Sequence, residues 1–496
     1  MKLKISVLLL VLATWSSTAQ KFTLKWSTNT ETRGVTNILG GNKDAFYVSY
    51  RNTDKELFCR KYDYNANLLM EKRIDFNFGE DKKMYYEGAF FMKDRIDHFI
   101  YEHKRREDLK TFYTSSTDFN LNVSPEIKVL EERPDDDEIF ANMRFSKDST
   151  QVLLFSEPKT KGNDPCTYVF KIFDSKFQKV LLEKTVELPF RSKKVNIKDI
   201  QLDNFGNIYL LAYIEKEREE REDDFSKFCY KVFIINKTDN IKEIKFDYKF
   251  NNISSIRLAP GDNNTMLCSG FLRDISNSFF SRRKNNLSNE FFNCIIDCKT
   301  TNTLSSQVLE LTGLYPEKLR KEEDFVPYSV RSVFNRKDGG YIVVAEQYKM
   351  VQVQSSRGYT YTYLYYCDIA VIHINNKSEV ESVSRIPKYQ LNAKNPSIYA
   401  AYMNDEVYIL FEDLEKNLEA SDDKEVKRSS NGLFTSDSKN AIFIATIQKD
   451  GSIKKEVLFS YKDTNLRPKI GGILKVKNKV VFNADDTVGI LEIAKP

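Results

Sequence analysis

Acidic residues recur at one position of a repeated pattern, at the end of an apolar run that follows a polar turn. Carboxylates act as general acids, general bases and cation ligands, so this recurrence is the first candidate for chemistry. Several carboxylates at equivalent heights would repel one another, which raises their pKa values or requires a cation or a basic partner. The six residues are Glu102, Glu157, Glu215, Glu346, Glu412 and Asp485.

Two interpretations of these carboxylates compete. In the functional interpretation they bind a metal or a cationic ligand at a common mouth. In the structural interpretation each accepts backbone N–H bonds or pairs with a Lys or Arg of the next unit, and repetition in nearly every unit favours this second interpretation. Calcium would need about six to eight oxygen ligands from a compact loop, and no EF-hand-like spacing is present. We therefore assign no metal ligand and no cofactor, and leave a structural cation open.

A tyrosine stripe is the second candidate. The segment 357–366 alternates with period two, which places alternate tyrosines on one face of a strand. With residues 350–354 pairing back through a turn at 355–358, it predicts a protruding hairpin. Exposed tyrosines suit contact with a protein or a carbohydrate, because their rings offer a large rigid area with a polar tip. The alternative is that the stripe packs on a neighbouring insertion. The four residues are Tyr359, Tyr361, Tyr363 and Tyr365.

Other chemistry-bearing patterns are weak. The chain has three histidines. His98 and His103 lie five residues apart on a predicted strand, so they face opposite sides and do not predict a shared metal site. The sequence contains no G-x-S-x-G elbow, no P-loop and no H-E-x-x-H motif. We assign no catalytic residue.

The elements that must position these residues form a repeat of about eight strand-rich units. Four-stranded antiparallel sheets repeated around an axis form a β-propeller, and we expect eight blades, with seven as the alternative. A pair of β-sandwiches would also show many short strands. The units begin near Val35, Met84, Ile139, Val195, Ile253, Tyr328, Pro396 and Arg467.

The eighth unit contains only three predicted strands, at 470–476, 480–483 and 488–493. A fourth strand is available at the other end of the chain, at 22–26. We expect this N-terminal strand to pair into the last blade, because that pairing closes the ring and leaves only short, protected edges.

The N-terminus indicates export. Residues 1–19 combine Lys2 and Lys4, a short apolar run and a small-residue cleavage site, as in a secretory signal peptide, so the propeller should occupy residues 20–496. No Cys follows the apolar run, so we expect no lipoprotein anchor. The apolar run is too short to span a bilayer, and no later run reaches about 18 apolar residues. We expect a periplasmic, outer-membrane-associated or extracellular protein without a transmembrane segment.

Composition excludes some partners. Apolar residues make up 41% of the chain, aromatic residues 13%, and the formal net charge is +5. This near-balance of interspersed charges lacks the basic footprint that nucleic-acid binding needs.

Among the seven cysteines, Cys294 and Cys298 lie four residues apart on a predicted strand, roughly 13 Å, which is too far for a disulfide. We interpret most cysteines as small buried hydrophobic residues, with one cross-strand bridge left open.

The segments 339–348, 368–374, 386–388 and 466–469 carry a resemblance to known proteins. They resemble an uncharacterised group of exported, propeller-like proteins of Bacteroidetes bacteria. The resemblance is best over residues 328–496. It implies a fold and a compartment, and it supplies no catalytic motif.

Two function classes follow. The first is a non-enzymatic binding or scaffold protein of the bacterial cell envelope, which uses the loop face of the propeller to bind an envelope protein or a glycan. The alternative is a glycan-active hydrolase or lyase in which carboxylates at the propeller mouth act as acid and base. That alternative needs two carboxyl groups either about 5 Å or about 6.5–9.5 Å apart in a cleft.

Overall fold

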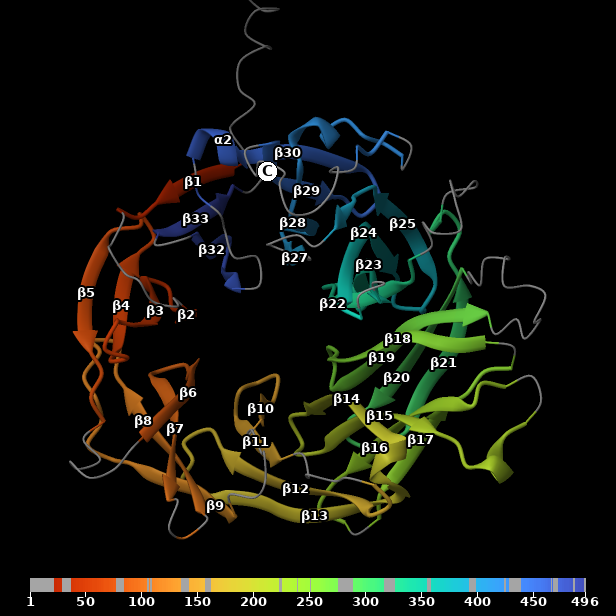
Figure 1. Ribbon diagram of the computed structural model, residues 1–496, viewed down its shortest axis with the longest axis horizontal. Coiled ribbons are helices and arrows are strands. Elements are labelled where there is room, and N and C mark those ends of the chain that lie inside the picture. Colours follow the sequence, from red (N-terminus) through yellow and green to blue (C-terminus); the bar gives the residue numbers. More distant parts are fainter. Residues whose placement is uncertain are drawn as a thin grey trace, which may run out of the picture.

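The computed structural model is all-β, and its eight sheets follow one another around a ring (Figure 1). It describes residues 22–494 except 29–36, 77–83, 105, 106, 108, 135–141, 157–161, 223, 224, 239, 250, 275–288, 316–325, 355–357, 392–397, 423, 424, 428–438, 465, 467–471, 485 and 486. Each sheet is a blade of four antiparallel strands, A to D, with strand A innermost in the ring. The chain is an eight-bladed β-propeller, as the repeat predicts.

The strands of blades 1 to 4, in the order A to D, are β2 (Asn37–Gly41), β3 (Ala45–Arg51), β4 (Leu57–Asp63) and β5 (Leu68–Arg73); β6 (Met84–Phe91), β7 (Ile96–Lys104), β8 (Leu109–Thr117) and β9 (Lys128–Pro134); β10 (Asn142–Phe145), β11 (Gln151–Ser156), β12 (Pro165–Asp174) and β13 (Val180–Arg191); and β14 (Val195–Leu202), β15 (Ile208–Glu215), β16 (Phe228–Ile235) and β17 (Lys242–Phe246).

The strands of blades 5 to 8 are β18 (Asn251–Pro260), β19 (Thr265–Asp274), β20 (Glu290–Asp297) and β21 (Thr303–Glu310); β22 (Tyr328–Asn335), β23 (Tyr341–Gln354), β24 (Thr360–Ile374) and β25 (Val380–Ile386); β27 (Ile398–Met403), β28 (Glu406–Leu414), β29 (Asn440–Ile447) and β30 (Ile453–Ser460); and β31 (Leu474–Val476), β32 (Lys479–Ala484), β33 (Thr487–Ile493) and β1 (Phe22–Trp26). A two-residue strand, β26 (Gln390–Leu391), adds to β24 in blade 6.

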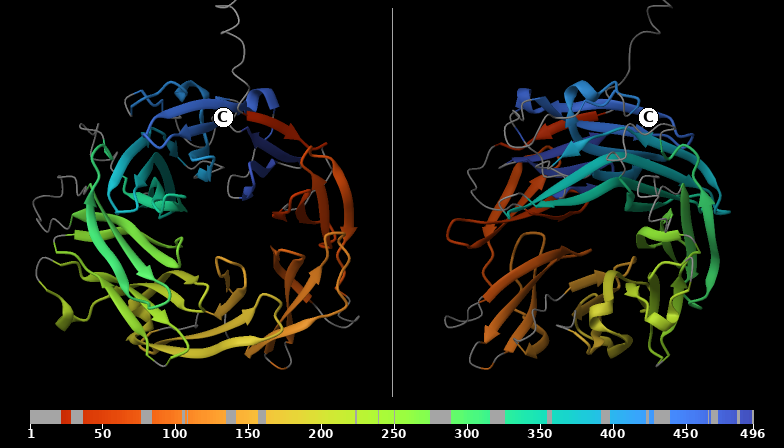
Figure 2. Two further views of the ribbon diagram at one scale, coloured as in Figure 1. Left: turned by 180° about the vertical axis from the view of Figure 1, so that it is seen from behind. Right: turned by 45° about the vertical axis from the view of Figure 1, so that its right-hand side comes forward.

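Blade 8 is completed from both ends of the chain. β1 pairs antiparallel with β33, from Phe22 opposite Ile493 to Trp26 opposite Gly489. Figure 2 shows this N-terminal strand, in red, lying against the blue C-terminal strands. The expected closure by the N-terminal strand is confirmed, and each end of the ring is held by the other.

The connections between strands lie on two opposite faces of the propeller. The A–B and C–D turns lie on one face, which we call the A–B face; the B–C and D–A connections lie on the other, the B–C face. The A–B turns of blades 4 and 6 each contain a glycine at positive φ, Gly206 (83°) and Gly339 (84°). Asp203 supports the first of these turns by accepting hydrogen bonds from the backbone N–H groups of Phe205 and Asn207. The polar turns in the sequence therefore set the strand registers.

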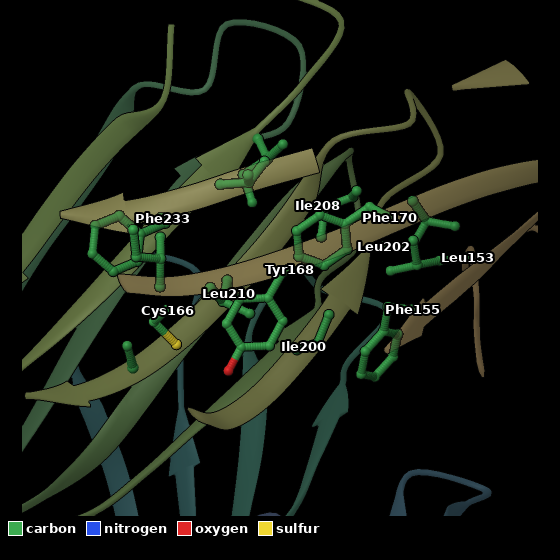
Figure 3. Packing of buried hydrophobic residues seen from close by; sticks show 14 of the residues in the cluster. Leu153, Phe155, Cys166, Tyr168, Phe170, Ile200, Leu202, Ile208, Leu210 and Phe233 are labelled. Carbon is green, nitrogen blue, oxygen red and sulfur yellow. The ribbon is translucent and has the colours of Figure 1, made fainter. Parts of the chain in front are cut away.

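Among the described residues, the apolar core forms eight clusters, one between each pair of adjacent blades. Figure 3 shows the cluster between blades 3 and 4, which includes Phe170, Leu210 and Phe233. The cluster that joins blade 8 to blade 1 contains Val481 and Phe46. Because strands B and C are covered on both faces, their sequences are near-continuous runs of apolar residues.

β-bulges interrupt the innermost strand of five blades. In each, the pairing of strand A with strand B skips one residue of strand A. A bulge bends the strand and redirects the side chain of the extra residue. The skipped residues are Leu39, Glu87, Lys198, Ser254 and Arg331.

All seven cysteines are buried, as small hydrophobic residues would be, and Cys294 and Cys298 are free thiols. Cys268 lies directly opposite Cys294 across β19 and β20. Within the described residues, no helix is long and apolar enough to cross a membrane. Residues 1–19, the expected signal peptide, lie outside the described residues.

Candidate functional site

The predicted tyrosine hairpin is present and extends blade 6 well beyond its neighbours. β23 and β24 are 14 and 15 residues long, and their pairing continues to Gln354 opposite Thr360. Tyr359 and Tyr361 are 65% and 52% exposed. Tyr363 and Tyr365 are half-buried, and the ring of Tyr365 lies edge-on to Tyr389, 6.3 Å between centroids. The outer half of the stripe is therefore open to solvent, and the inner half packs on its own blade.

Apolar side chains occur on both faces of this hairpin. Val353 lies opposite Tyr361 on one face, and Met350 lies opposite Leu364 on the other. Met350 is 57% exposed and Val353 is 45% exposed. The hairpin therefore presents neutral aromatic and aliphatic surface on two sides of a thin ribbon.

A change of register marks the base of the hairpin. Pairing shifts between Glu346 and Tyr348, so Gln347 has no partner residue on β24. The Gln347 side chain instead accepts a hydrogen bond from the backbone N–H of Asp368 (3.2 Å). Asp368 is paired with Arg385 (2.8 Å) and accepts the backbone N–H of Lys388 (3.2 Å). The blade proper ends here, and the extension is tied at this point to the segment that leaves β25.

Glu346, one of the six predicted carboxylates, is the centre of the base. Its side chain is fully buried and forms ion pairs with Lys388, also fully buried, and with Arg331 (2.9 Å). Arg331 is the bulged residue of β22, and its guanidinium lies 5.5 Å from the ring centre of Tyr348 and 5.9 Å from that of Tyr366. The bulge thus directs a cation between the carboxylate and the first tyrosines of the hairpin.

Lys388 also connects blade 6 to blade 7. Its ammonium donates to Oε1 of Gln390 (3.0 Å), and Nε2 of Gln390 donates to the backbone carbonyl of Glu412 (2.6 Å). The Glu412 carboxylate accepts hydrogen bonds from Tyr461 (2.8 Å) and Asn440 (2.6 Å). We call this chain from Arg331 to Glu412 the base network; it makes the support of the hairpin continuous with the next blade.

Asp413 follows Glu412 directly on β28, and its side chain is buried. Burial raises the pKa of its carboxyl to about 7, although the Leu414 N–H and the Asn417 amide donate to it. A carboxyl with this pKa is partly protonated near neutral pH. The sequence gives a weak signal for it, an acidic residue directly after the repeated acidic position.

The other predicted carboxylates are held locally. Glu102 accepts a hydrogen bond from Tyr113 (2.9 Å), and Glu215 pairs with Arg221 (3.0 Å). Glu157 and Asp485 lie outside the described residues. These donors to Glu102, Glu215, Glu346 and Glu412 come from the same blade or from the connection that leaves it, whereas we expected backbone N–H groups or cations of the next blade. The donors lie on strand A, on strand C, or in the connections of the same blade.

No metal site emerges from the part of the chain that the structure describes: it contains no group of three or more His, Cys, Asp or Glu side chains placed to hold an ion. His98 is fully buried and shares a hydrogen bond with Thr117 (3.0 Å), while His103 lies five residues further along β7. Lys388 and Arg331, which complete the base network, were missed in the sequence because neither belongs to the repeated acidic pattern.

Comparisons with known proteins add no chemistry to the site. No protein-family model and no curated protein matches the chain. Similar solved structures include an oligogalacturonate lyase in complex with manganese (9% identity, TM-score 0.36, 96% of this chain and 97% of that chain). They also include the β-propeller domain of the trilobed protease from Pyrococcus furiosus (13%, 0.35, 89% and 97%). A Bacteroides caccae protein of unknown function is a third (10%, 0.27, 71% and 93%). At these identities and scores the likenesses carry no argument about activity.

Proposed function

We propose that this protein is a non-enzymatic binding protein of the bacterial cell envelope, and that the hairpin of blade 6 on the B–C face is its binding element. The observation that carries the proposal is the combination of an exposed apolar ribbon with a buried ionic base. Tyr359 and Tyr361 are more than half exposed, whereas Glu346 and Lys388 beneath them are fully buried. Function commonly resides in long connections held by a rigid scaffold.

The chemistry of the hairpin favours a protein partner. Its described tip consists of Tyr, Thr, Val, Met and Gln side chains without a carboxylate, so recognition rests on apolar area and neutral hydrogen bonds. Tyrosine gives large contact area at low conformational-entropy cost. Because both faces expose apolar side chains, the ribbon suits insertion between two protein surfaces. A glycan is the alternative ligand that a test must distinguish.

The geometry of the carboxylates supports a role other than acid–base catalysis. Both oxygens of Glu346 face cations, and both oxygens of Glu412 accept hydrogen bonds from Tyr461 and Asn440. A general acid or base must instead reach the substrate proton within hydrogen-bond distance. These two carboxylates are therefore better suited to holding the hairpin than to hydrolysing a glycan.

The cellular compartment is part of the proposal and rests on the signal-like N-terminus. The test is capture of partners from a native envelope extract with the wild-type protein and with a variant whose 349–366 hairpin is shortened to a tight turn. We expect a specific protein that the wild type retains and the variant loses. Retention of the same proteins by both would contradict the proposal. If the variant loses only glycan fragments that the wild type retains, the ligand of the hairpin is a glycan.

A further inference from the structure

A separate cavity lies on the opposite face of the propeller, at the other end of β23 from the hairpin. It has a volume of about 300 Å³ and lies between blades 6 and 7. Its walls come from the A–B turns of both blades, the C-terminal end of β24 and the C–D turn of blade 7. The charged and polar lining residues are Arg336, Lys337, Asp338, His373, Tyr402, Asp405 and Lys449. The volume is at the lower end of the range of about 300–1,000 Å³ for small-molecule sites.

His373 is the unusual member of this lining. It is 1% exposed, and within the described residues neither of its ring nitrogens has a hydrogen-bond partner. Buried polar groups of native proteins are nearly always paired, and an unpaired one costs about 1–3 kcal/mol. Burial and the nearby Arg336 lower the pKa of His373 to about 4, so its ring is neutral at pH 7. A neutral imidazole provides one donor and one acceptor.

The charges around the cavity balance. Arg336 is paired with Asp338 and with Glu381, which lies behind the lining, and Lys449 lies 3.2 Å from Asp338. Across the cavity, Lys337 lies 3.5 Å from Asp405, which also accepts a hydrogen bond from Tyr402 (3.0 Å). Three cationic and three anionic side chains therefore sum to zero with His373 neutral. An ionic ligand would compete with pairs that already exist, whereas a neutral ligand would not.

We infer that this cavity binds a neutral, polyhydroxylated ligand of about monosaccharide size. A hydroxyl group can donate to Asp338 or Asp405 and accept from Lys449 or Lys337, and it can either donate to the acceptor nitrogen of the neutral His373 ring or accept from its N–H. The half-buried ring of Tyr402 offers an apolar wall for the C–H face of a sugar. This site is independent of the hairpin, because it uses different turns on the other face of the molecule.

The low number of histidines allows a direct test by NMR. The untagged full chain, labelled with ¹⁵N-histidine, gives ring signals from only His98, His103 and His373. A His373→Phe variant assigns the third set. Titration with glucose, galactose and N-acetylglucosamine, up to about 50 mM and well above a millimolar Kd, should shift the His373 signals saturably with at least one sugar and leave those of buried His98 in place.

Three results of the titration would each overturn the inference. They are no shift of the His373 signals with any of the sugars, a shift with glycine or sulfate in place of the sugars, and a shift that does not saturate. A matched pair of variants checks the location. Lys449→Ala should weaken the binding of the sugar roughly fivefold to tenfold. Lys454 is exposed and paired with Glu456 outside the lining, so Lys454→Ala should leave the affinity for the sugar unchanged. Equal effects of the two substitutions would also contradict it.

Discussion

Lys388 and Glu346 form an ion pair in which neither side chain has exposed surface. Taking two charges out of water is costly, and the cost is offset only if the geometry and the additional hydrogen bonds are good. Arg331 and Gln390 provide those additional contacts, one on the Glu346 side and one on the Lys388 side. The pair holds a long hairpin on one blade and joins that blade to the next.

Removal of one partner of this pair should be strongly destabilising. Lys388→Met leaves Glu346 buried with Arg331 as its remaining cation, and we expect a loss of about 3 kcal/mol in the free energy of unfolding. The double variant Lys388→Met/Glu346→Gln should recover part of this loss. Urea denaturation checks both. The exposed pair of Lys454 and Glu456 is the control, because Lys454→Met should cost less than about 1 kcal/mol. Equal losses at the buried and exposed sites would refute the role of the base network.

Asp413 should make the protein less stable as the pH rises. Its folded pKa is about 7, above the ordinary value of 3.8, so the folded state holds its proton more tightly than the unfolded state. The stability linked to this proton is fully present below about pH 4 and is lost as the pH rises toward 7. Asp413→Asn keeps an oxygen acceptor for Asn417 and Leu414, and its amide does not titrate. The free energy of unfolding of this variant, relative to the wild type, should therefore increase from pH 5 to pH 7.5. A difference that is constant with pH would show that Asp413 does not titrate in this window.

The sequence predicted what depends on pattern and missed what depends on local backbone geometry. The closure by residues 22–26 could be predicted because the last unit lacked one strand, and the hairpin because Tyr359 to Tyr365 alternate with period two. Glu346 was found by its repeated position, but its partners were not. Arg331 reaches it because of a bulge, and Lys388 reaches it from a segment beyond β25, and neither position has a periodic signal. His373 was missed because a single histidine on an apolar strand has the pattern of an ordinary core residue.

Closure of the ring depends on the aromatic contacts of β1. Trp26 packs edge-on against Phe459 (5.2 Å between ring centroids) and Phe482 (5.5 Å). Trp26→Ala should therefore lower the free energy of unfolding by about 2–4 kcal/mol, measured by urea denaturation. We expect blade 8 to unfold first in this variant. Phe205→Ala, at a 43% exposed position, should change stability by no more than about 0.5 kcal/mol. A small effect of Trp26→Ala would mean that the ring is held closed without this strand.

Arg331 should control the rigidity of the hairpin more than the rigidity of the blade. Arg331→Met leaves Glu346 paired with Lys388 but removes the cation from the rings of Tyr348 and Tyr366. We expect faster amide hydrogen exchange in residues 348–354 and unchanged exchange in residues 341–345, measured by mass spectrometry. Unchanged exchange in both segments would show that the bulged arginine does not support the extension.

The central claim is that the exposed tip of the hairpin binds a protein partner, and quantitative capture tests it most directly. Wild type, Tyr359→Ser/Tyr361→Ser and the control Leu68→Ser/Leu69→Ser are each presented to the same native envelope extract. The control removes exposed apolar side chains of blade 1, which are 41% and 53% exposed. We expect a partner that the wild type and the control retain equally and the tyrosine variant retains at least tenfold less. A partner retained equally by all three proteins would contradict the account.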